Sequence, residues 1–503
     1  MLPTKMLVKY IDVFKSVLFR KSLGKTHNIV ETSLGKTHNI VETSLRKTRK
    51  RRFFMDFNRK VINEFVSWKE SLKTKRKALV IKGLRQIGKT HIAKKFAKDN
   101  YDNVILIDFK KEPSMKKCFD ADLNVDTLVT NISANKPGVL FIPHKTVLIL
   151  DEIQECSAAR ASIKSFMEDG RFDIIATGSL LGIKGYNSKY SGGVSVGFEH
   201  TIYMKAMDFE EFLWALGINE DVVNYVKKCF ENKVEVNEAV HQAFTRYFRE
   251  YMCVGGLPEV VKKFIETKDM NQVRNEQMDL IEEYKDDFAK HLDENEQEKV
   301  DKALLTQINK VFDSLPSQLA KENKKFMVSK IDKRGTLEKY SSAIQWLVDY
   351  GLVDRCYNLT IPELPLEGNK IQEIFKLFFS DTGLLIASLD EGTAGHILSG
   401  DLGIYKGAIY EQSFADAYLK NKKKLYYFSK ESGLEIDFVT QNNDEAILIE
   451  VKAKDGRTKA ASEVLNNKEK YKDVARMIRL KDSNVGTINN INTFPSYMSF
   501  LLS

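Results

Sequence analysis

Residues 83–90 have the composition of a phosphate-binding loop. Their letters, Gly-Leu-Arg-Gln-Ile-Gly-Lys-Thr, fit the pattern GxxxxGK[ST] and follow an apolar stretch, Ala78–Ile81, that is typical of a strand. Glycines permit a tight loop whose backbone N–H groups can cradle phosphates at the start of a helix. We therefore expect Lys89 to contact the β- and γ-phosphates of ATP, and Thr90 to bind Mg²⁺. The nucleotide contacts that we predict are Gly83, Arg85, Gln86, Gly88, Lys89, Thr90 and Ser179.

Two adjacent acids follow a second apolar strand, Val147–Leu150. In an α/β protein, Asp151 at this strand end would hold Mg²⁺ or one of its waters, and Glu152 would act as general base for the attacking water. Ser179 closes the next predicted strand and could sense the γ-phosphate, although a simple turn explains it too. The pattern predicts an ATP hydrolase with ATP and Mg²⁺ as its ligands.

A second group of acids and a lysine lies near the C-terminus. Alternation along a strand puts Glu450 and Lys452 on one face, and a neighbouring strand carries Asp437. Asp437 and Glu450 could share Mg²⁺, Lys452 could steady an attacking hydroxide, and Glu411 on a predicted helix, Ala408–Lys420, could complete the site. Acid–lysine pairs also cross solvated sheet faces without any catalytic role, so both interpretations stay open.

The elements that must position the first site alternate between strand and helix. Strands are predicted at Ala78–Ile81, Val104–Phe109, Val147–Leu150 and Asp173–Ala176, with helices such as Ile92–Lys98 and Ala158–Glu168 between them. This order predicts a parallel, doubly wound sheet. The C-terminal part mixes strands and helices again, with strands at Leu425–Phe428, Ile436–Thr440 and Ala446–Val451.

Residues 300–360 have the pattern of a winged helix. We predict a helix at Lys302–Asp313, a short second helix after Pro316, a third at Leu337–Tyr350 that ends at Gly351, and a strand at Leu352–Leu359. The third helix could enter a DNA groove, with phosphate contacts from nearby basic residues, although winged helices also serve as packing modules. These basic residues are Lys321, Lys324, Lys325, Lys330, Lys333 and Arg334.

The positive charge of the chain belongs to its first residues. The formal net charge is +9, and residues 1–54 alone carry 13 Lys and Arg against 3 Asp and Glu, a net of +10. Within this stretch Ser22–Thr32 is repeated letter for letter as Ser33–Thr43. We interpret residues 1–54 as a disordered or mistranslated leader, with a basic arm that touches nucleic acid as the alternative. No apolar run is long enough to span a membrane, and five scattered cysteines favour a reducing cytoplasm.

Several strings together resemble a prokaryotic family of predicted AAA+-type ATPases that carry a C-terminal domain of unknown function. They are Leu84–Thr90, Leu150–Gln154, Ala176–Ser179, Met207–Leu213 and Gly255–Val260. Family members often show a Gly-Arg pair shortly before the fourth string, but Ser191–Gly197 lacks arginine here, so Arg246 or Arg249 would have to supply any such group. The resemblance implies an ATPase that can form homo-oligomers. The C-terminal strands resemble the PD-(D/E)XK restriction-endonuclease-like fold, which implies metal-dependent phosphodiester cleavage.

The predicted fold is therefore a multidomain α/β protein. It comprises a leader (1–54), a parallel AAA+-like P-loop domain (55–220), a helical lid (221–299), a winged helix (300–368) and a restriction-endonuclease-like α/β domain (369–503). Three functions remain open. The first is an ATPase coupled to a nuclease on DNA, with Lys89, Glu152, Glu450 and Lys452 as catalytic residues. The second is a non-cutting ATP switch that binds DNA or a protein partner. The third is a structural ATP-binding protein whose nucleotide only stabilises the fold.

Overall fold

A computed structural model describes residues 56–120, 122–179, 197–293, 302–320, 324–401, 406–452, 459–488 and 491–502. The leader and its repeat lie outside the described residues, as do Lys321 and most of the stretch Ser191–Gly197. The chain divides into two compact units, and Phe57–Ser503 form one of them. Among the described residues, no helix is both long and apolar enough to cross a bilayer.

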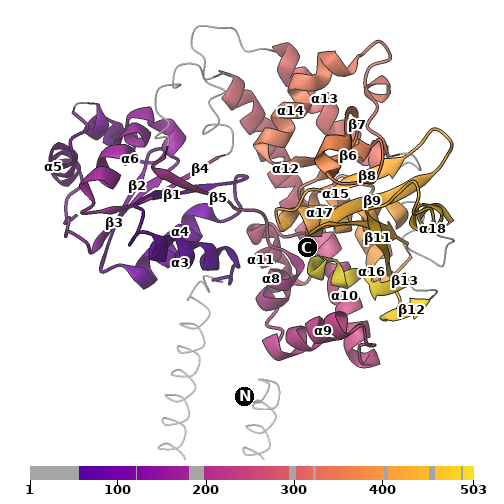
Figure 1. Ribbon diagram of the computed structural model, residues 1–503. Coiled ribbons are helices and arrows are strands. Elements are labelled where there is room, and N and C mark those ends of the chain that lie inside the picture. Colours follow the sequence, from indigo (N-terminus) through magenta and orange to yellow (C-terminus); the bar gives the residue numbers. More distant parts are fainter. Residues whose placement is uncertain are drawn as a thin grey trace, which may run out of the picture. The chain divides into compact units, whose positions relative to one another are not determined.

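The N-terminal part of Phe57–Ser503 is built on a parallel five-stranded sheet with helices on both faces (Figure 1). The strands lie in the order β2-β3-β4-β1-β5, and every pairing in this sheet is parallel. The predicted strands and the predicted doubly wound topology are thus confirmed. Its elements are α3 (Val61–Ser71), β1 (Ala78–Lys82), α4 (Lys89–Asn100), β2 (Asn103–Asp108), α5 (Val125–Asn135), β3 (Thr146–Asp151), α6 (Ser157–Asp169), β4 (Asp173–Gly178) and β5 (Glu199–Tyr203).

The central strands are buried on both faces because helices cover each side of this sheet. On β1, Leu79 and Ile81 pack into the core that contains Phe65 and Phe96 of α3 and α4, whereas the alternate residue Val80 packs into the core formed with α5 and α6. Such a strand reads as a continuous apolar run rather than as an alternating pattern. The apolar runs that were predicted as strands have this physical origin.

Helices dominate the middle of the chain. They are α8 (Phe209–Ala215), α9 (Glu220–Asn232), α10 (Glu238–Val254), α11 (Pro258–Thr267), α12 (Met270–Asp293), α13 (Lys302–Leu319) and α14 (Leu337–Tyr350). Helix α14 has the predicted bounds: Thr336 caps its first turn through the Lys339 amide, and Gly351 ends it with a φ of 90°. The sequence thus carries signals for both ends of this helix, a capping threonine and a terminal glycine, and the predicted end at Gly351 is confirmed.

The predicted separate helix after Pro316 is wrong. Helix α13 runs through Pro316 to Leu319, and the proline sits inside it. Proline removes one backbone hydrogen bond from a helix. The buried side chains Val311, Phe312 and Leu315 precede Pro316, and Leu319 follows on the same helix, so packing keeps the chain helical across it.

A mixed eight-stranded sheet forms the core of the C-terminal part (Figure 1). Its order is β12-β13-β11-β10-β9-β8-β6-β7, so the hairpin β6–β7 is the edge of this sheet, with β6 parallel to β8. The predicted boundary at 368/369 falls between these two strands. The elements are β6 (Val353–Leu359), β7 (Lys370–Phe379), α15 (Thr382–Ala387), α16 (Thr393–Ser399), α17 (Lys406–Lys420), β8 (Tyr426–Ser429), β9 (Glu435–Asn442), β10 (Glu445–Val451), α18 (Lys459–Asn466), β11 (Val474–Lys481), β12 (Gly486–Ile488) and β13 (Ile491–Pro495).

Candidate functional site

The predicted phosphate-binding loop joins the carboxyl end of β1 to the first residue of α4. Gly88 has a φ of 88° and Gln86 a φ of 63°, so the loop uses left-handed backbone just before the helix. A side chain on Gly83 would collide with the Met204 carbonyl, which explains the need for glycine there. The backbone N–H groups of Lys89 and Thr90 thus open a helix beside a tight loop, as a phosphate-binding loop requires.

Lys89 is a buried cation that contacts backbone carbonyls rather than a carboxylate of the described residues. Its ammonium donates to the carbonyls of Gly83 (3.0 Å) and Leu84 (2.8 Å), and only 6% of the residue is exposed. Burial lowers the pKa of Lys89 to about 8, and the charges of Glu152 and Asp151 oppose that shift only in part. No carboxylate among the described residues forms an ion pair with it, so its charge is available to an anionic ligand.

The acid pair meets this loop at the carboxyl end of β3. Asp151 Oδ1 accepts a hydrogen bond from the Thr90 hydroxyl at 2.7 Å and one from the Thr177 hydroxyl. The structure thus brings together the predicted magnesium residues Thr90 and Asp151, and it adds Thr177 from the end of β4. An oxygen-rich group of this kind suits Mg²⁺, which prefers carboxylates and hydroxyl or water oxygens.

Glu152 follows Asp151 in an unusual backbone conformation. Its φ of 54° places a non-glycine residue in the left-handed region, which costs about 1 kcal/mol and is common at functional sites. The Gln154 side chain donates a hydrogen bond to Glu152 Oε2 and orients the carboxylate. Ser179, just beyond β4, is 3% exposed, and its hydroxyl has no hydrogen-bond partner among the described residues. Both observations fit residues arranged for a bound group.

Sequence reasoning missed Asp108, a further acid at the same sheet edge. It ends β2 directly beside Asp151 in the strand register, and it accepts hydrogen bonds from the amides of Lys110 and Lys111. Burial would raise its pKa, but the Lys111 side chain and these amides lower it below its ordinary value, so Asp108 stays ionised. The signal was present in the sequence, because Asp108 is a strand-end acid like Asp151.

The C-terminal acids and lysine also come together. Lys452 Nζ lies 2.7 Å from Glu450 Oε2 and 3.3 Å from Asp437 Oδ2, and the Val451 amide donates to the same Asp437 oxygen at 2.9 Å. Burial and then Asp437 raise the pKa of Glu450 to about 7. The Glu450 Oε1 atom is buried and accepts no hydrogen bond from any described residue. These contacts join Asp437, Glu450 and Lys452. Burial and then the charge of Glu411 raise the pKa of Asp437, so the fourth predicted residue also acts on this cluster.

Glu411 on α17 contacts two lysines that sequence reasoning did not place there. Lys324 donates to Glu411 Oε1 at 2.5 Å, and the fully buried Lys376 lies 3.6 Å from Oε2. Burial would raise the pKa of Glu411, but these two ammonium groups lower it below its ordinary value. Within the described ranges, no group of three or more His, Cys, Asp or Glu has the arrangement of a metal site. Glu411 is therefore neutralised by lysines, and the second metal site stays a prediction.

Of the two arginines considered as substitutes for a missing family arginine, Arg249 is already engaged. Its guanidinium lies 3.5 Å from the Asp482 carboxylate, and Arg246 lies over the Tyr247 ring at 4.9 Å. Neither contact involves the phosphate-binding loop.

Three family models match successive parts of the chain. Residues 75–213 match an AAA domain, residues 245–394 match a domain of unknown function (DUF8612), and residues 406–497 match a second domain of unknown function (DUF4143). No curated protein matches the chain. The five-stranded sheet and the phosphate-binding loop lie within or beside the AAA match, and Glu411, Asp437 and Glu450 lie within the last match.

The solved structures that match the chain share little sequence with it. The Aeropyrum pernix ORC2 protein in its ADPNP–ADP complexes is 12% identical, with a TM-score of 0.34 and coverage of 72% of this chain and 96% of that one. The Aeropyrum pernix ORC1 protein in complex with DNA is 12% identical, with a TM-score of 0.28 and coverage of 70% and 95%. The Thermotoga maritima RuvB Holliday junction branch migration motor is 12% identical, with a TM-score of 0.27 and coverage of 59% and 90%. TM-scores this low add nothing to the family matches.

Proposed function

Because the chain joins an AAA domain to a C-terminal DUF4143 domain, we propose that it is a Mg²⁺-dependent ATPase whose nucleotide state acts on its C-terminal part. One observation carries the proposal. The buried Lys89, which has no carboxylate partner in the described part of the chain, and the Thr90–Asp151 hydrogen bond of 2.7 Å lie at the same phosphate-binding loop. A cation that lacks a counter-ion and lies beside a carboxylate–hydroxyl pair fits a triphosphate with its magnesium.

Each residue at this loop would have a distinct role. Lys89 would exchange its two carbonyl contacts for phosphate oxygens, and Thr90 and Asp151 would hold Mg²⁺, which neutralises charge on the phosphates when bound. The Glu152 carboxylate would accept a proton from the attacking water, with Gln154 fixing its orientation. The Ser179 hydroxyl, which is buried without a partner among the described residues, would donate to a phosphate oxygen.

ATP turnover by two single variants tests this proposal. Lys89→Ala should weaken ATP binding, because it removes the buried ammonium that the proposal assigns to the phosphates. Glu152→Gln should keep ATP binding and lose turnover by about 100-fold or more, because it removes the general base. Wild-type ATP affinity in Lys89→Ala, measured by calorimetry with Mg²⁺, would contradict the proposal.

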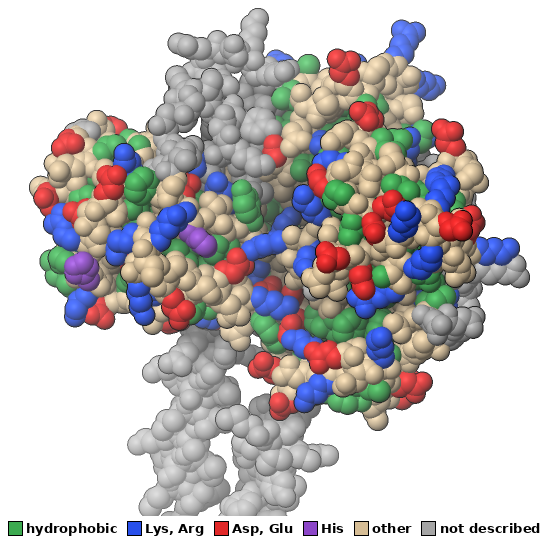
Figure 2. Space-filling view, in the orientation of Figure 1, with side chains coloured by type: hydrophobic (Ala, Val, Ile, Leu, Met, Phe, Trp, Pro, Cys, Tyr) green, Lys and Arg blue, Asp and Glu red, His purple; other side chains and the backbone are tan. Residues whose placement is uncertain are grey.

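DNA contact is the finer part of the same proposal. Lys330, Lys333 and Arg334 are exposed and precede α14, whereas Lys324 is committed to Glu411. On the face shown in Figure 2, basic and acidic side chains are interspersed, so any DNA contact must come from such local clusters. Phosphate contacts from these three residues would make binding depend on salt.

Fluorescence anisotropy with duplex DNA tests this contact. Alanine at Lys330, Lys333 and Arg334 together should reduce affinity and lower the salt slope by about 0.9 for each phosphate interaction that the substitutions remove. The matched control replaces the exposed residues Lys73, Lys75 and Lys228, which removes the same charge elsewhere. Equally weakened binding in both triple variants would reduce the effect to overall charge and reject α14 as the contact.

DNA cleavage at the C-terminal cluster is a second candidate function. The contact between Lys452 and both Asp437 and Glu450 favours it, because two carboxylates with a lysine can hold one Mg²⁺ and steady an attacking hydroxide. The two lysines on Glu411 favour the non-cutting switch instead, because they already satisfy that carboxylate. Plasmid nicking with Mg²⁺ or Mn²⁺ that disappears in Glu450→Ala would support cleavage, and an absence of nicking with either metal would support the switch.

A further inference from the structure

The phosphate-binding loop is held from outside the AAA domain by one face of α12. Arg85 Nη1 lies 2.5 Å from Asp287 Oδ1, and the Gln86 side chain donates to Glu283. The Tyr284 hydroxyl between these acids donates to the Arg85 carbonyl at 3.2 Å. Glu283 and Asp287 are four residues apart and therefore share a helix face. Helix α12 thus contacts the side chains of two neighbouring loop residues, Arg85 and Gln86, and the backbone of Arg85.

Asp287 also connects α12 to α14. The Tyr350 hydroxyl, on the last residue of α14, donates to Asp287 Oδ2 at 2.7 Å. The Tyr350 ring stacks on Trp346 with centroids 4.9 Å apart and an angle of 14° between the planes, and Phe288 packs edge-on against Trp346 at 4.9 Å. Burial and then Asp287 raise the pKa of Tyr350, so its hydroxyl remains a donor. One carboxylate therefore contacts both the loop and the helix proposed to approach DNA.

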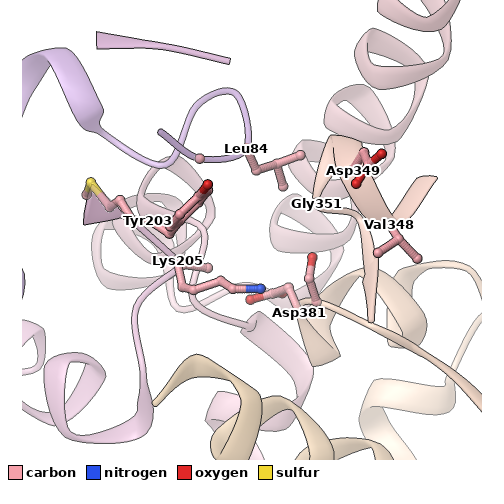
Figure 3. A pocket seen from close by; sticks show the side chains of 11 residues that line it. Leu84, Tyr203, Lys205, Val348, Asp349, Gly351 and Asp381 are labelled. Carbon is pink, nitrogen blue, oxygen red and sulfur yellow. The ribbon is translucent and has the colours of Figure 1, made fainter. Parts of the chain in front are cut away.

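A cavity adjoins the residues next to Arg85 in the loop and next to Tyr350 in α14. This cavity of about 170 Å³ is lined by Gly83 and Leu84 of the loop, by Tyr203–Ala206, and by Val348, Asp349 and Gly351 at the end of α14. Figure 3 shows Leu84 on one side of the cavity and Val348 and Asp349 on another. Because close-packed interiors resist displacement, an unfilled volume here lets the loop and the end of α14 shift relative to each other.

The Arg85 guanidinium can bind either the Asp287 carboxylate or a phosphate. Arg85 belongs to the phosphate-binding loop, four positions before Lys89. Burial lowers the pKa of Lys89, and the charge of Arg85 adds to that effect. Asp287 is 3% exposed, and water therefore screens its charge only weakly. A guanidinium binds phosphate and carboxylate oxygens with the same geometry, so the two anions compete for it.

We propose that Asp287 competes with the phosphates of ATP for Arg85, so that nucleotide binding releases the phosphate-binding loop from Asp287, and with it from Tyr350 and α14. This inference rests on the proposed ATP binding and adds the route by which it reaches the C-terminal part. Coupling of this kind is reciprocal. Weakening the contact between Asp287 and Arg85 must therefore tighten ATP binding, in addition to any effect of ATP on α14.

The first test measures ATP affinity by calorimetry with Mg²⁺ in the full chain. Asp287→Asn should bind ATP about tenfold more tightly, since it frees Arg85 for the phosphates. The matched control is Asp286→Asn, which removes an exposed acid from the same turn of α12. The gain from Asp287→Asn should vanish when Arg85→Gln is also present. Equal affinities of Asp287→Asn and Asp286→Asn, or a gain that persists without Arg85, would overturn the inference.

The second test compares the wild-type chain with one tryptophan variant, so it does not depend on a folded Asp287 variant. Saturating ATP should change the tryptophan emission, and the change should be absent in Trp346→Phe, because Trp346 stacks on Tyr350. An unchanged Trp346 signal at saturating ATP would overturn the inference while leaving ATP binding intact. If instead Lys89→Ala binds ATP as tightly as the wild type, the proposed ATPase function is rejected. The two outcomes therefore distinguish failure of the Asp287 inference from failure of the proposed function.

Discussion

Both candidate sites combine acidic residues with lysines, but their lysines have different neighbours. In the AAA domain, the Lys89 ammonium lies against two carbonyls and has a lowered pKa. In the C-terminal cluster, Lys376 and Lys452 lie against carboxylates. Burial would lower the pKa of each, but their acidic neighbours raise it above the ordinary value.

This difference decides what each site can accept. A buried cation without a counter-ion gains free energy when an anion arrives, whereas a cation already paired must first lose its partner. The AAA site is therefore suited to an anionic ligand. In the C-terminal cluster, the lysines are already paired with carboxylates of the protein, so an arriving anion would have to displace one of them.

The largest expected contrast is between the two aspartates of these sites. Asp151→Asn should lower ATP turnover about 100-fold, because it weakens the hold on Mg²⁺ while the amide oxygen can still accept from Thr90. Asp437→Asn should leave ATP turnover unchanged. Steady-state phosphate release at saturating Mg²⁺ measures both, and equal effects would erase the distinction between the sites.

The next effect concerns stability. Glu411→Gln should lower the free energy of unfolding by about 3 kcal/mol, because it removes the carboxylate that pairs with Lys324 and leaves Lys376 paired with Glu435. Urea denaturation at pH 7 measures it. Glu373→Gln on the exposed side of β7 is the control, and it should change stability little. A neutral Glu411→Gln would show that these lysines do not depend on Glu411.

Replacing Glu450 should raise the free energy of unfolding, whereas replacing Glu411 should lower it. Its folded pKa of about 7 lies above the ordinary 4.5, so the folded state binds the extra proton between these values, and stability is lost as pH rises through 7. Glu450→Gln should therefore raise the free energy of unfolding by about 1–3 kcal/mol at pH 8. At pH 4.5 and below, where wild-type Glu450 is protonated, the difference should disappear. Thermal unfolding across this range gives the answer, and a gain that is independent of pH would contradict the assignment.

The smallest effect concerns pH and ATP. Because the pKa of Lys89 is about 8, its charge is lost above that pH, and a bound triphosphate must restore the proton. The dissociation constant of ATP should rise about tenfold between pH 7 and pH 9. Lys89→Arg should show no such rise, since arginine keeps its charge. Parallel pH curves for the two proteins would place the titrating group elsewhere.

Local patterns predicted much of the fold because their causes are local. The runs of β1, β3 and β4 are apolar because both faces of the sheet are covered, and Thr336 and Gly351 mark the ends of α14. The prediction that a helix ends before Pro316 was wrong because the deciding cause is not local. The cost of the proline is local, but the burial of Phe312, Leu315 and Leu319 that outweighs it depends on tertiary packing.

By itself, the sequence determined the P-loop, the strand-end acids and the order of strands and helices around them, since each follows from spacing along the chain. Tertiary structure alone decided which charges from distant positions meet. Lys324 and Lys376 reach Glu411 from distant positions, and Asp287 reaches Arg85 from a helix far along the chain. Strand alternation could place Glu450 beside Lys452, but an ion pair between remote residues depends on distance in space, and no local pattern encodes it.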